Sequence, residues 1–298
     1  MASDESKLKR PIKRYAMRHT IWRRVRGLFA IIASSRVAMI GLTLVGLWVF
    51  FAVFAPLLSP YGPTEQDRYA MNEGPSLRHI LGTDHLGRDL WTRVIYGART
   101  ILVLAPLAVL SALVIGTTLG LTGGYFGGWI DEVVMRVLDA IMAFPPILLY
   151  LIIIVALGPS ALNVVLAITI TGAPGIARLV RSMTLDIRTR EYIAAAELRG
   201  ENPLYIMFVE ILPNARGPVI VDAMLRIGYA VFAIGTLGFL GLGLPPPSPD
   251  WGSMVATGRQ YIYINIWAVL WPSIAISSLV IGLNLFADGL REESMRYQ

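Results

Sequence analysis

Long stretches without a single charged side chain constrain the fold of this chain more than any other feature. Residues 37–60, 100–130 and 140–177 contain no Asp, Glu, Lys or Arg. A helix needs about 20 apolar residues to cross the hydrocarbon core of a bilayer, so each stretch is long enough to span a membrane. Charged residues make up 15% of the chain, against roughly 25% in soluble domains. The sequence therefore predicts an all-α integral membrane protein.

The apolar pattern predicts six transmembrane helices. The stretch at 140–177 is too long for one span, and Gly158-Pro159-Ser160 divides it, because proline lacks a backbone donor and glycine favours a turn. Two more apolar stretches follow, and the first of them contains Asp222 and Arg226. The expected spans cover residues 37–59, 100–122, 134–157, 161–180, 217–243 and 265–287, within one membrane domain (37–292) that lies between a basic arm (1–36) and a short tail (293–298).

The distribution of basic residues predicts that both termini are cytoplasmic. The first 36 residues carry ten Lys and Arg side chains against Asp4 and Glu5, and basic segments stay on the cytoplasmic side. With six spans, residues 178–216 are then cytoplasmic, and residues 61–99 and 245–259 lie outside. A cleaved signal peptide is the alternative for the first apolar stretch, but signal cores have only about 7–15 residues. The basic arm could also bind nucleic acid; juxtamembrane charge explains it more simply, and no nucleic-acid partner is expected.

The few reactive side chains exclude most catalytic chemistry. The chain has no cysteine, and its only lysines are Lys7, Lys9 and Lys13, so no lysine follows a glycine-rich phosphate loop. His79 and His85 are six residues apart, the wrong spacing for one helical face, and no metal site is expected from them. The sequence predicts a protein that is not an enzyme, binds no cofactor itself and does not hydrolyse ATP.

A charged interruption, EYIAAAELRGENPLYIMFVEILPNA, separates two of the apolar stretches. Thr189 is expected to cap a helix that starts at Arg190, whose three consecutive alanines leave room for another surface to approach. Gly200 is expected to end that helix in the left-handed conformation that glycine tolerates. The sequence thus predicts a short helix followed by a tight glycine turn.

A second short helix is expected directly after this turn. Asn202 is a suitable N-cap, and Pro203 fits the first helical position. The helix would run through the apolar sequence LYIMFVEIL and stop at Pro213. Such a helix could insert into the groove of a partner, or the two helices could form a hairpin that packs on its own bundle.

This interruption resembles the EAA loop of the permeases of ABC importers. The family pattern has two alanines, three residues and a glycine, followed nine residues later by a short motif that ends in Leu-Pro. The matching positions are Ala195, Ala196, Gly200, Leu212 and Pro213. Two positions depart from the pattern, since the frequent leading Glu is Ala194 here and the usual Ile before x-Leu-Pro is Glu210.

Four further segments resemble one class of these permeases, that of dipeptide, oligopeptide and nickel transport. They are LGTDHLGRDLWTRVIYGART (81–100), GGYFGGWIDEVVMRVLDAIMAFP (123–145), FLGLGLPPPSPDWGSM (239–254) and NLFADGLRE (284–292). Together they resemble the second, C-type subunit of the heterodimeric permease pairs of this class. The resemblance extends over about residues 37–292.

The resemblance implies a subunit of an ATP-driven importer in the bacterial inner membrane, which forms half of a path for peptides or related small solutes. The implied partners are a homologous B-type permease, two ABC ATPase subunits that bind ATP and Mg²⁺, an extracytoplasmic solute-binding protein and membrane lipid. The implied ATPase-coupling residues are Ala195, Ala196, Gly200, Asn202, Pro203, Leu212 and Pro213. The alternatives are an ion-coupled secondary transporter, which needs ionisable groups near the bilayer midplane, a membrane enzyme and a scaffold.

Charged and aromatic residues outside the loop are further candidates. Asp84 is expected to cap a helix that carries Arg88 and Asp89, and this segment either contacts an external partner or forms a self-contained salt-bridged cap. Trp251, in a proline-rich outer loop, would contact a partner or gate the path, or anchor at the membrane interface. Two expected intramembrane ion pairs lie near cytoplasmic span ends and either fix helix rotation or contact substrate. These pairs are Arg136 with Asp139 and Asp222 with Arg226.

Overall fold

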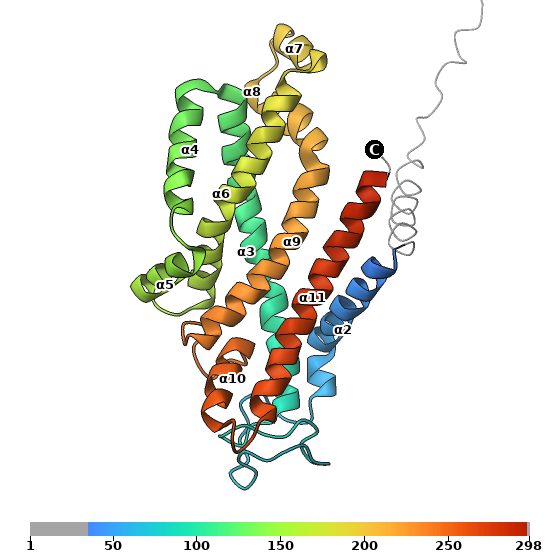
Figure 1. The fold of residues 1–298 in the computed structure, drawn as a ribbon, viewed down its shortest axis with the longest axis vertical. Coiled ribbons are helices and arrows are strands. Elements are labelled where there is room, and N and C mark those ends of the chain that lie inside the picture. Colours follow the sequence, from blue (N-terminus) through green and yellow to red (C-terminus); the bar gives the residue numbers. More distant parts are fainter. Residues whose placement is uncertain (1–34, 297–298) are drawn as a thin grey trace, which may run out of the picture.

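The computed structural model describes residues 35–296, which form an elongated bundle of helices (Figure 1). The long helices are α2 (Arg36–Leu58), α3 (Leu90–Phe126), α4 (Gly128–Met142), α5 (Pro146–Leu157), α6 (Ala161–Arg188), α9 (Leu212–Phe239) and α11 (Trp267–Arg296). The short elements are α7 (Glu191–Leu198), α8 (Pro203–Tyr205), the π-helical segment η1 (Ile206–Ile211), α10 (Trp251–Gly258) and the 3-10 turn η2 (Arg259–Tyr261).

Five helices are long and apolar enough to cross a membrane, and a sixth span results if α4 and α5 count as one. These two helices meet at an angle of 88°. The bend falls at Pro145 and Pro146, which cannot donate the backbone hydrogen bonds of a continuing helix. The expected span at 134–157 is therefore two pieces, with α5 turned away from α4 (Figure 1).

Several helices extend beyond the uncharged stretches from which the spans were inferred. Helix α3 begins at Leu90, well before the expected start at residue 100, and α6 continues to Arg188 instead of ending at residue 180. Hydropathy detects the part of a helix that meets hydrocarbon, whereas the backbone hydrogen bonds continue into polar sequence. Helix α11 likewise continues to Arg296, through most of the segment expected to be a tail. The basic arm lies almost entirely outside the described residues.

Helices α3 and α6 form the centre of the bundle and make its most extensive contact. Their backbones approach closely because glycines of α3 face α6. A Cβ atom at Gly116 would lie 2.6 Å from the Ala173 oxygen, and one at Gly120 would lie 2.5 Å from the Ala177 oxygen. Larger residues at either position would push the two helices apart.

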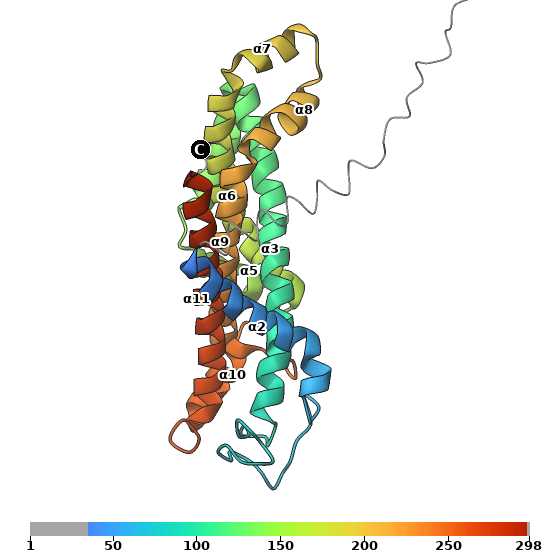
Figure 2. The same cartoon turned by 90° about the vertical axis from the view of Figure 1, so that its right-hand side faces the viewer.

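Helices α2 and α11 pack against each other on one side of this centre, and α11 also contacts α9 (Figures 1 and 2). The Trp48 indole of α2 donates a hydrogen bond to the Ser278 hydroxyl of α11 over 3.0 Å. Its ring also lies 4.9 Å from the ring of Trp251, between centroids. These contacts tie the first and last long helices to the buried core near α10.

The two ends of the bundle are built differently. At one end, α7 and α8 project beyond the long helices, and α7 lies across their axis (Figure 2). At the other end, the loop between α2 and α3 gathers next to α10 and the start of α11 (Figure 1). The predicted coupling residues and the predicted external contacts therefore lie at opposite ends of the molecule.

Candidate functional site: a projecting helical segment and a cavity in the bundle

The projecting segment consists of α7, a glycine turn, α8 and η1. It begins later than the sequence predicts, because Thr189 belongs to the end of α6. The Thr189 hydroxyl donates to the Asp186 oxygen over 2.8 Å, and its backbone N–H also bonds backward into α6. The prediction that Thr189 caps the next helix is wrong. Helix α7 starts at Glu191 without a side-chain cap.

The glycine turn has the predicted conformation. Gly200 adopts φ +74°, in the left-handed region. Its N–H donates to the Glu197 oxygen over 2.9 Å, and the Glu201 N–H donates to the Ala196 oxygen over 3.2 Å. This pair of bonds is the Schellman arrangement, which satisfies carbonyl groups at the end of a helix. The turn reverses the chain after α7 and directs it into the next helix.

The second helix starts as predicted but does not end at Pro213. Asn202 accepts a hydrogen bond from the Leu204 N–H over 2.8 Å, and Pro203 is the first helical residue. The helix then continues through η1 and α9 to Phe239. The Leu212 N–H bonds to the Met207 oxygen, five residues back, so the turn before Pro213 is wide and the helix continues past a residue without a donor. We call the helical stretch Pro203–Ile211 the docking helix. It continues into α9, and the two form one continuous helical arm, Pro203–Phe239.

One face of the projecting segment anchors it to the bundle. Ile193 and Ala196 of α7 are buried with residues of η1, α3 and α6. The Tyr125 hydroxyl of α3 lies 3.2 Å from the Glu197 carboxylate of α7, and the Arg188 guanidinium covers the Tyr125 ring at 5.6 Å. These contacts tie α7 and the end of α6 to the end of α3.

The opposite face of this segment is exposed and largely apolar. Leu198 is 90% exposed and Leu204 is 59% exposed. Exposed apolar groups beyond the membrane-spanning part of a protein mark a contact surface for another protein. Of the predicted coupling residues, Ala195, Gly200, Asn202, Pro203 and Pro213 are exposed, Leu212 is half-buried and Ala196 is buried. We call this exposed surface the docking face; it comprises Tyr192, Ala195, Leu198, Leu204, Tyr205, Phe208 and Val209.

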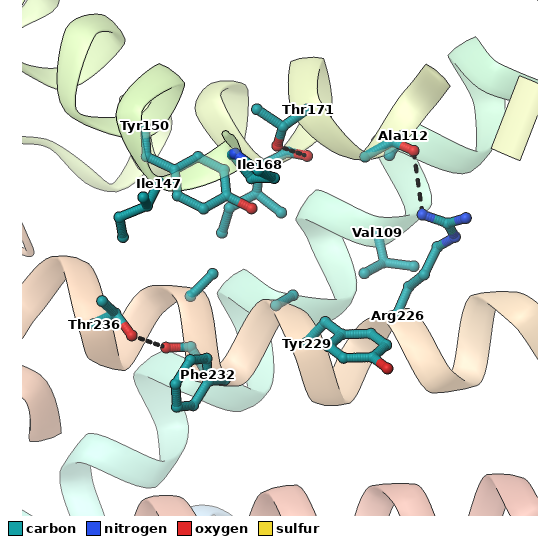
Figure 3. Close-up of a pocket in the computed structure, with 14 residues that line it drawn as sticks. Val109, Ala112, Ile147, Tyr150, Ile168, Thr171, Arg226, Tyr229, Phe232 and Thr236 are labelled. Atoms are coloured by element: carbon teal, nitrogen blue, oxygen red, sulfur yellow. Dashed lines mark hydrogen bonds between the residues drawn. The ribbon is translucent and has the colours of Figure 1, made fainter. Parts of the chain in front are cut away.

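A cavity of about 390 Å³ lies among α3, α5, α6 and α9 (Figure 3). This volume is in the range of small-molecule sites, roughly 300–1,000 Å³. Its lining is mostly apolar, with a few polar groups. The lining residues are Val109, Ala112, Pro146, Ile147, Tyr150, Ile168, Thr171, Gly172, Arg226, Tyr229, Ala230, Phe232, Ala233 and Thr236. Sequence reasoning missed the cavity, because its walls come from helices that are far apart in the chain.

Arg226 reaches from α9 toward α6 at this cavity (Figure 3). Its Nε donates to Asp222 Oδ2 over 2.5 Å, so the predicted pairing is present. Its Nη1 lies 3.4 Å from the Gly172 oxygen. Asp222 and Arg226 lie near the middle of α9, because this helix begins at Leu212, before the apolar stretch does.

The second predicted pair does not form. Arg136 pairs with Glu132, one turn earlier on α4, at 2.7 Å, and Asp139 instead binds Arg178 of α6. A further pair joins Asp131 of α4 to Arg181 of α6. The pairing of Arg136 with Asp139 is thus corrected, since α4 turns its carboxylates toward α6. These partners are 39 and 50 residues apart, and spacing along one helix could not reveal them.

At the far end, the predicted contact residues turn inward. Asp84 does not cap a helix: its Oδ1 accepts from the Leu86 and Arg88 N–H groups in a tight turn, and its Oδ2 pairs with Arg88 Nε at 2.7 Å. Asp89 is the N-cap of α3 and accepts from the Thr92 N–H over 2.8 Å. Asp84, Arg88 and Asp89 are all buried. This corrects the expectation of an exposed contact surface and fits the self-contained cap.

Trp251 is also an internal residue. It is fully buried, and its indole N–H donates to the Val94 oxygen over 2.8 Å. The interpretations of Trp251 as a partner contact or an interfacial anchor are therefore wrong. A tryptophan after a proline-rich loop is equally compatible with core packing, and only the close approach of Gly97 on α3 makes room for the ring.

The two histidines of this region have separate partners. His79 Nδ1 lies 3.0 Å from Asp89 Oδ1 in a buried pair, and the His85 ring stacks on Tyr261 at 5.0 Å. Within residues 35–296, no group of three or more His, Cys, Asp or Glu side chains could hold a metal ion. The described residues thus form a bundle of membrane-spanning helices with a cavity among them and an exposed apolar face at one end.

Comparison with known proteins identifies the family. Residues 112–292 match the binding-protein-dependent transport system inner membrane component, and residues 20–75 match the N-terminal transmembrane domain of oligopeptide transport permease C. The chain belongs to the family of binding-protein-dependent transport system inner membrane components. It is therefore a multi-pass bacterial inner-membrane permease subunit and not an ATPase, as the sequence resemblance predicts.

Individual relatives extend over most of the chain. It is 43% identical over 267 residues to the dipeptide transport system permease protein DppC of Alkalihalophilus pseudofirmus, covering 90% of this chain and 88% of the relative. It is 40% identical over 247 residues to the glutathione transport system permease protein GsiD of Pectobacterium atrosepticum, covering 83% and 82%. These relatives favour the importer over the ion-coupled secondary transporter.

A solved structure supports the fold. The inward-facing MetNI methionine ABC transporter matches with a TM-score of 0.55 and 22% identity, over 69% of this chain and 96% of the matched chain. The predicted all-α permease fold is confirmed.

Proposed function

We propose that this chain is the C-type permease subunit of an ATP-driven importer of dipeptides, oligopeptides or closely related peptide-like solutes. It would form half of the translocation path and a homologous B-type permease the other half. The observation that carries the proposal is the 43% identity to a dipeptide permease over 90% of the chain. The apolar cavity with few polar groups fits a solute of this kind.

The energy comes from two separate ABC ATPase subunits, which bind ATP and Mg²⁺. The docking face contacts one of them. The exposed coupling residues Ala195, Gly200, Asn202, Pro203 and Pro213 belong to this face or lie beside it, while Ala196 and Leu212 support it from behind. Its exposed apolar side chains suit a groove in a partner. The chain itself has lysines only at positions 7, 9 and 13, none of them in a phosphate-binding loop.

The orientation follows from the basic arm. The N terminus, the docking face and the end of α11 are cytoplasmic, and the opposite end of the bundle faces an extracytoplasmic solute-binding protein. Residues 1–36 are a cytoplasmic arm, residues 37–292 are the permease domain, and residues 293–298 are a cytoplasmic end that continues α11 as far as Arg296. Exposed apolar side chains of α2, such as Phe50, Phe54 and Leu57, contact membrane lipid.

We infer how the ATPases could move the helices that line the translocation path. Helix α9 continues the docking helix without a break, so a displacement of the docking face moves the cavity wall. The contact of Tyr125 with Glu197 transmits the same displacement to α3, which forms another wall. ATP-driven closure of the ATPases would thus change the cavity by rigid-body motion, with no covalent chemistry in this chain.

Purification of the tagged chain from native membranes, followed by vesicle transport, tests the proposal. We expect a second permease, ATPase subunits and ATP-dependent uptake of a labelled dipeptide in the presence of the binding protein. Recovery of the chain alone, with solute uptake that needs no ATP, would contradict it.

A further inference from the structure

Arg226 is the only charged residue among the described residues that line the cavity. An ionisable side chain within a membrane bundle is costly, and it usually faces a cavity or pairs with a neighbour. We propose that Arg226 binds the C-terminal carboxylate of the transported peptide during its passage. This inference rests on the proposed function and assigns a position to one part of the solute.

The hydrogen bonds of Arg226 leave part of its guanidinium free for a ligand. A guanidinium has five N–H donors in a planar fork. Asp222 takes the Nε donor at 2.5 Å, and the Gly172 oxygen lies at a long 3.4 Å from Nη1. Among residues 35–296, Nη2 has no hydrogen-bond acceptor. Nη2, and Nη1 with its long contact to Gly172, therefore retain donor capacity for a carboxylate oxygen.

Helix α6 leaves a space for this guanidinium. A Cβ atom at Gly175 would lie 2.8 Å from Arg226 Nη2 and 3.2 Å from Nη1. Any side chain at position 175 would therefore displace the guanidinium from its place beside α6. Asp222 on one side and Gly175 on the other hold the fork in one orientation, which reduces the entropic cost of binding a carboxylate.

The rest of the cavity has walls that suit apolar side chains of a short peptide. Arg226 and Tyr150 lie toward opposite ends of it (Figure 3). The hydroxyl groups of Thr171 and Thr236 donate to carbonyls of their own helices, so they add little polarity to the walls. Apolar side chains of a peptide can lie along these walls, while its carboxylate reaches the one cationic end.

The nearby Asp222 keeps the affinity of Arg226 for the peptide carboxylate low, so that the peptide binds only briefly during transport. Its negative charge offsets part of the attraction between Arg226 and an incoming carboxylate. Passage through a membrane protein requires a contact that is strong enough to admit the solute and weak enough to release it. A guanidinium with its own carboxylate partner meets both requirements.

Transport of a free dipeptide and of its C-terminal amide tests the proposal. Both are supplied to the complete transporter in vesicles, at concentrations that saturate the binding protein, so that selection by that protein is removed. In the wild type we expect faster uptake of the free acid. In Arg226→Gln we expect uptake of the acid to fall roughly tenfold or more, since charged hydrogen bonds are lost, with little change for the amide.

Two further variants support the interpretation. Gly175→Ala keeps the charge but displaces the guanidinium, and it should reduce the acid-to-amide ratio in the same way. Arg136→Gln removes an exposed, salt-bridged arginine of α4 outside the cavity, and it should leave both rates unchanged. If Arg226→Gln does not accumulate in the membrane, Gly175→Ala and Arg226→Lys give the same measurement.

An acid-to-amide ratio that Arg226→Gln and Gly175→Ala leave unchanged would overturn the assignment of Arg226, even if both rates fall together. Absence of dipeptide uptake by the wild-type complex would instead overturn the proposed function, and the role of Arg226 with it.

Discussion

The two ends of the bundle reverse the usual distribution of polarity. At the docking face, large apolar side chains such as Leu198 and Leu204 are exposed. At the opposite end, charged side chains such as Asp84, Arg88 and Asp89 are buried and bound to one another or to the backbone. The first end exposes apolar surface, whereas these three charged groups of the second end find partners within the chain. We infer from this difference that motion enters at the docking face and that the opposite end anchors the helices.

Substitution of Gly200 should have the largest effect on transport. Gly200→Val places a β-branched residue at φ +74°, which costs roughly 1–3 kcal/mol of backbone strain and should distort the docking face. We expect ATP-dependent uptake to fall roughly tenfold or more, with normal insertion into the membrane. Gly200→Asn is the matched control, because asparagine tolerates the left-handed conformation. Normal uptake by the valine variant would show that the turn is not needed for coupling.

At the anchoring end, Asp89→Ala should mainly reduce stability. The substitution removes the N-cap of α3, worth about 1 kcal/mol, and leaves His79 without its partner in a buried site. Leaving a buried polar group without its hydrogen-bond partner costs roughly 1–3 kcal/mol. Thermal unfolding of the purified complex measures the effect. Asp186→Ala, which removes an exposed pair with Arg190, should leave the unfolding temperature almost unchanged.

Tyr125→Phe tests whether α3 receives motion from α7. The ring and its packing remain, but the hydroxyl that binds Glu197 is lost, a change of about 0.5–1.5 kcal/mol. We expect a modest fall in peptide uptake per ATP hydrolysed, and the same result for Glu197→Gln. Tyr263→Phe, at a fully exposed position away from the docking face, is the control for loss of a hydroxyl. An unchanged ratio in both Tyr125→Phe and Glu197→Gln would restrict the coupling route to α9.

A small pH effect should distinguish the anchoring end. Burial raises the pKa of Asp250 above its usual 3.8, although Ser253 and Gly252 donate hydrogen bonds to it. The Asp250 carboxyl therefore binds a proton more tightly in the folded state than in the unfolded state. Its contribution to stability is present below pH 3.8 and is lost as the pH rises through the folded pKa. Unfolding temperatures are measured from pH 3.8 upward for the wild type and for Asp250→Asn. The fall in stability that is due to Asp250 should be absent in the variant. An identical pH profile would contradict it.

The sequence predicted those parts of the molecule that depend on local chemistry. Uncharged stretches indicate the spans, and the Gly200 turn and the Asn202-Pro203 start follow from conformational preference. The missed features depend on how helices face one another. The pairing of Asp139 with Arg178 and the position of Arg226 at a cavity require the rotation of α4, α6 and α9, which no local pattern contains.

Proline gave the opposite outcome at two places. At Pro145-Pro146 the helix breaks with an 88° bend, whereas at Pro213 it continues. Before Pro213 the π-helical segment η1 provides a wide turn. Helices α2, α3, α6 and α11 also continue past a proline, at Pro56, Pro106, Pro174 and Pro272. A proline alone therefore does not predict the end of a helix in this chain.

The π-helical segment η1 also determines which face of α9 points toward the cavity. Each residue of an α-helix turns the chain by about 100°, and a π turn holds one residue more than an α turn does. Everything after η1, including Arg226, is therefore oriented relative to the docking helix by the wide turn at Ile206–Ile211. Deleting one residue of η1, so that regular α-helical bonding is restored, would leave the orientation of α9 around the helix axis unchanged. An insertion or deletion later in the arm would turn a different face of α9 toward the cavity.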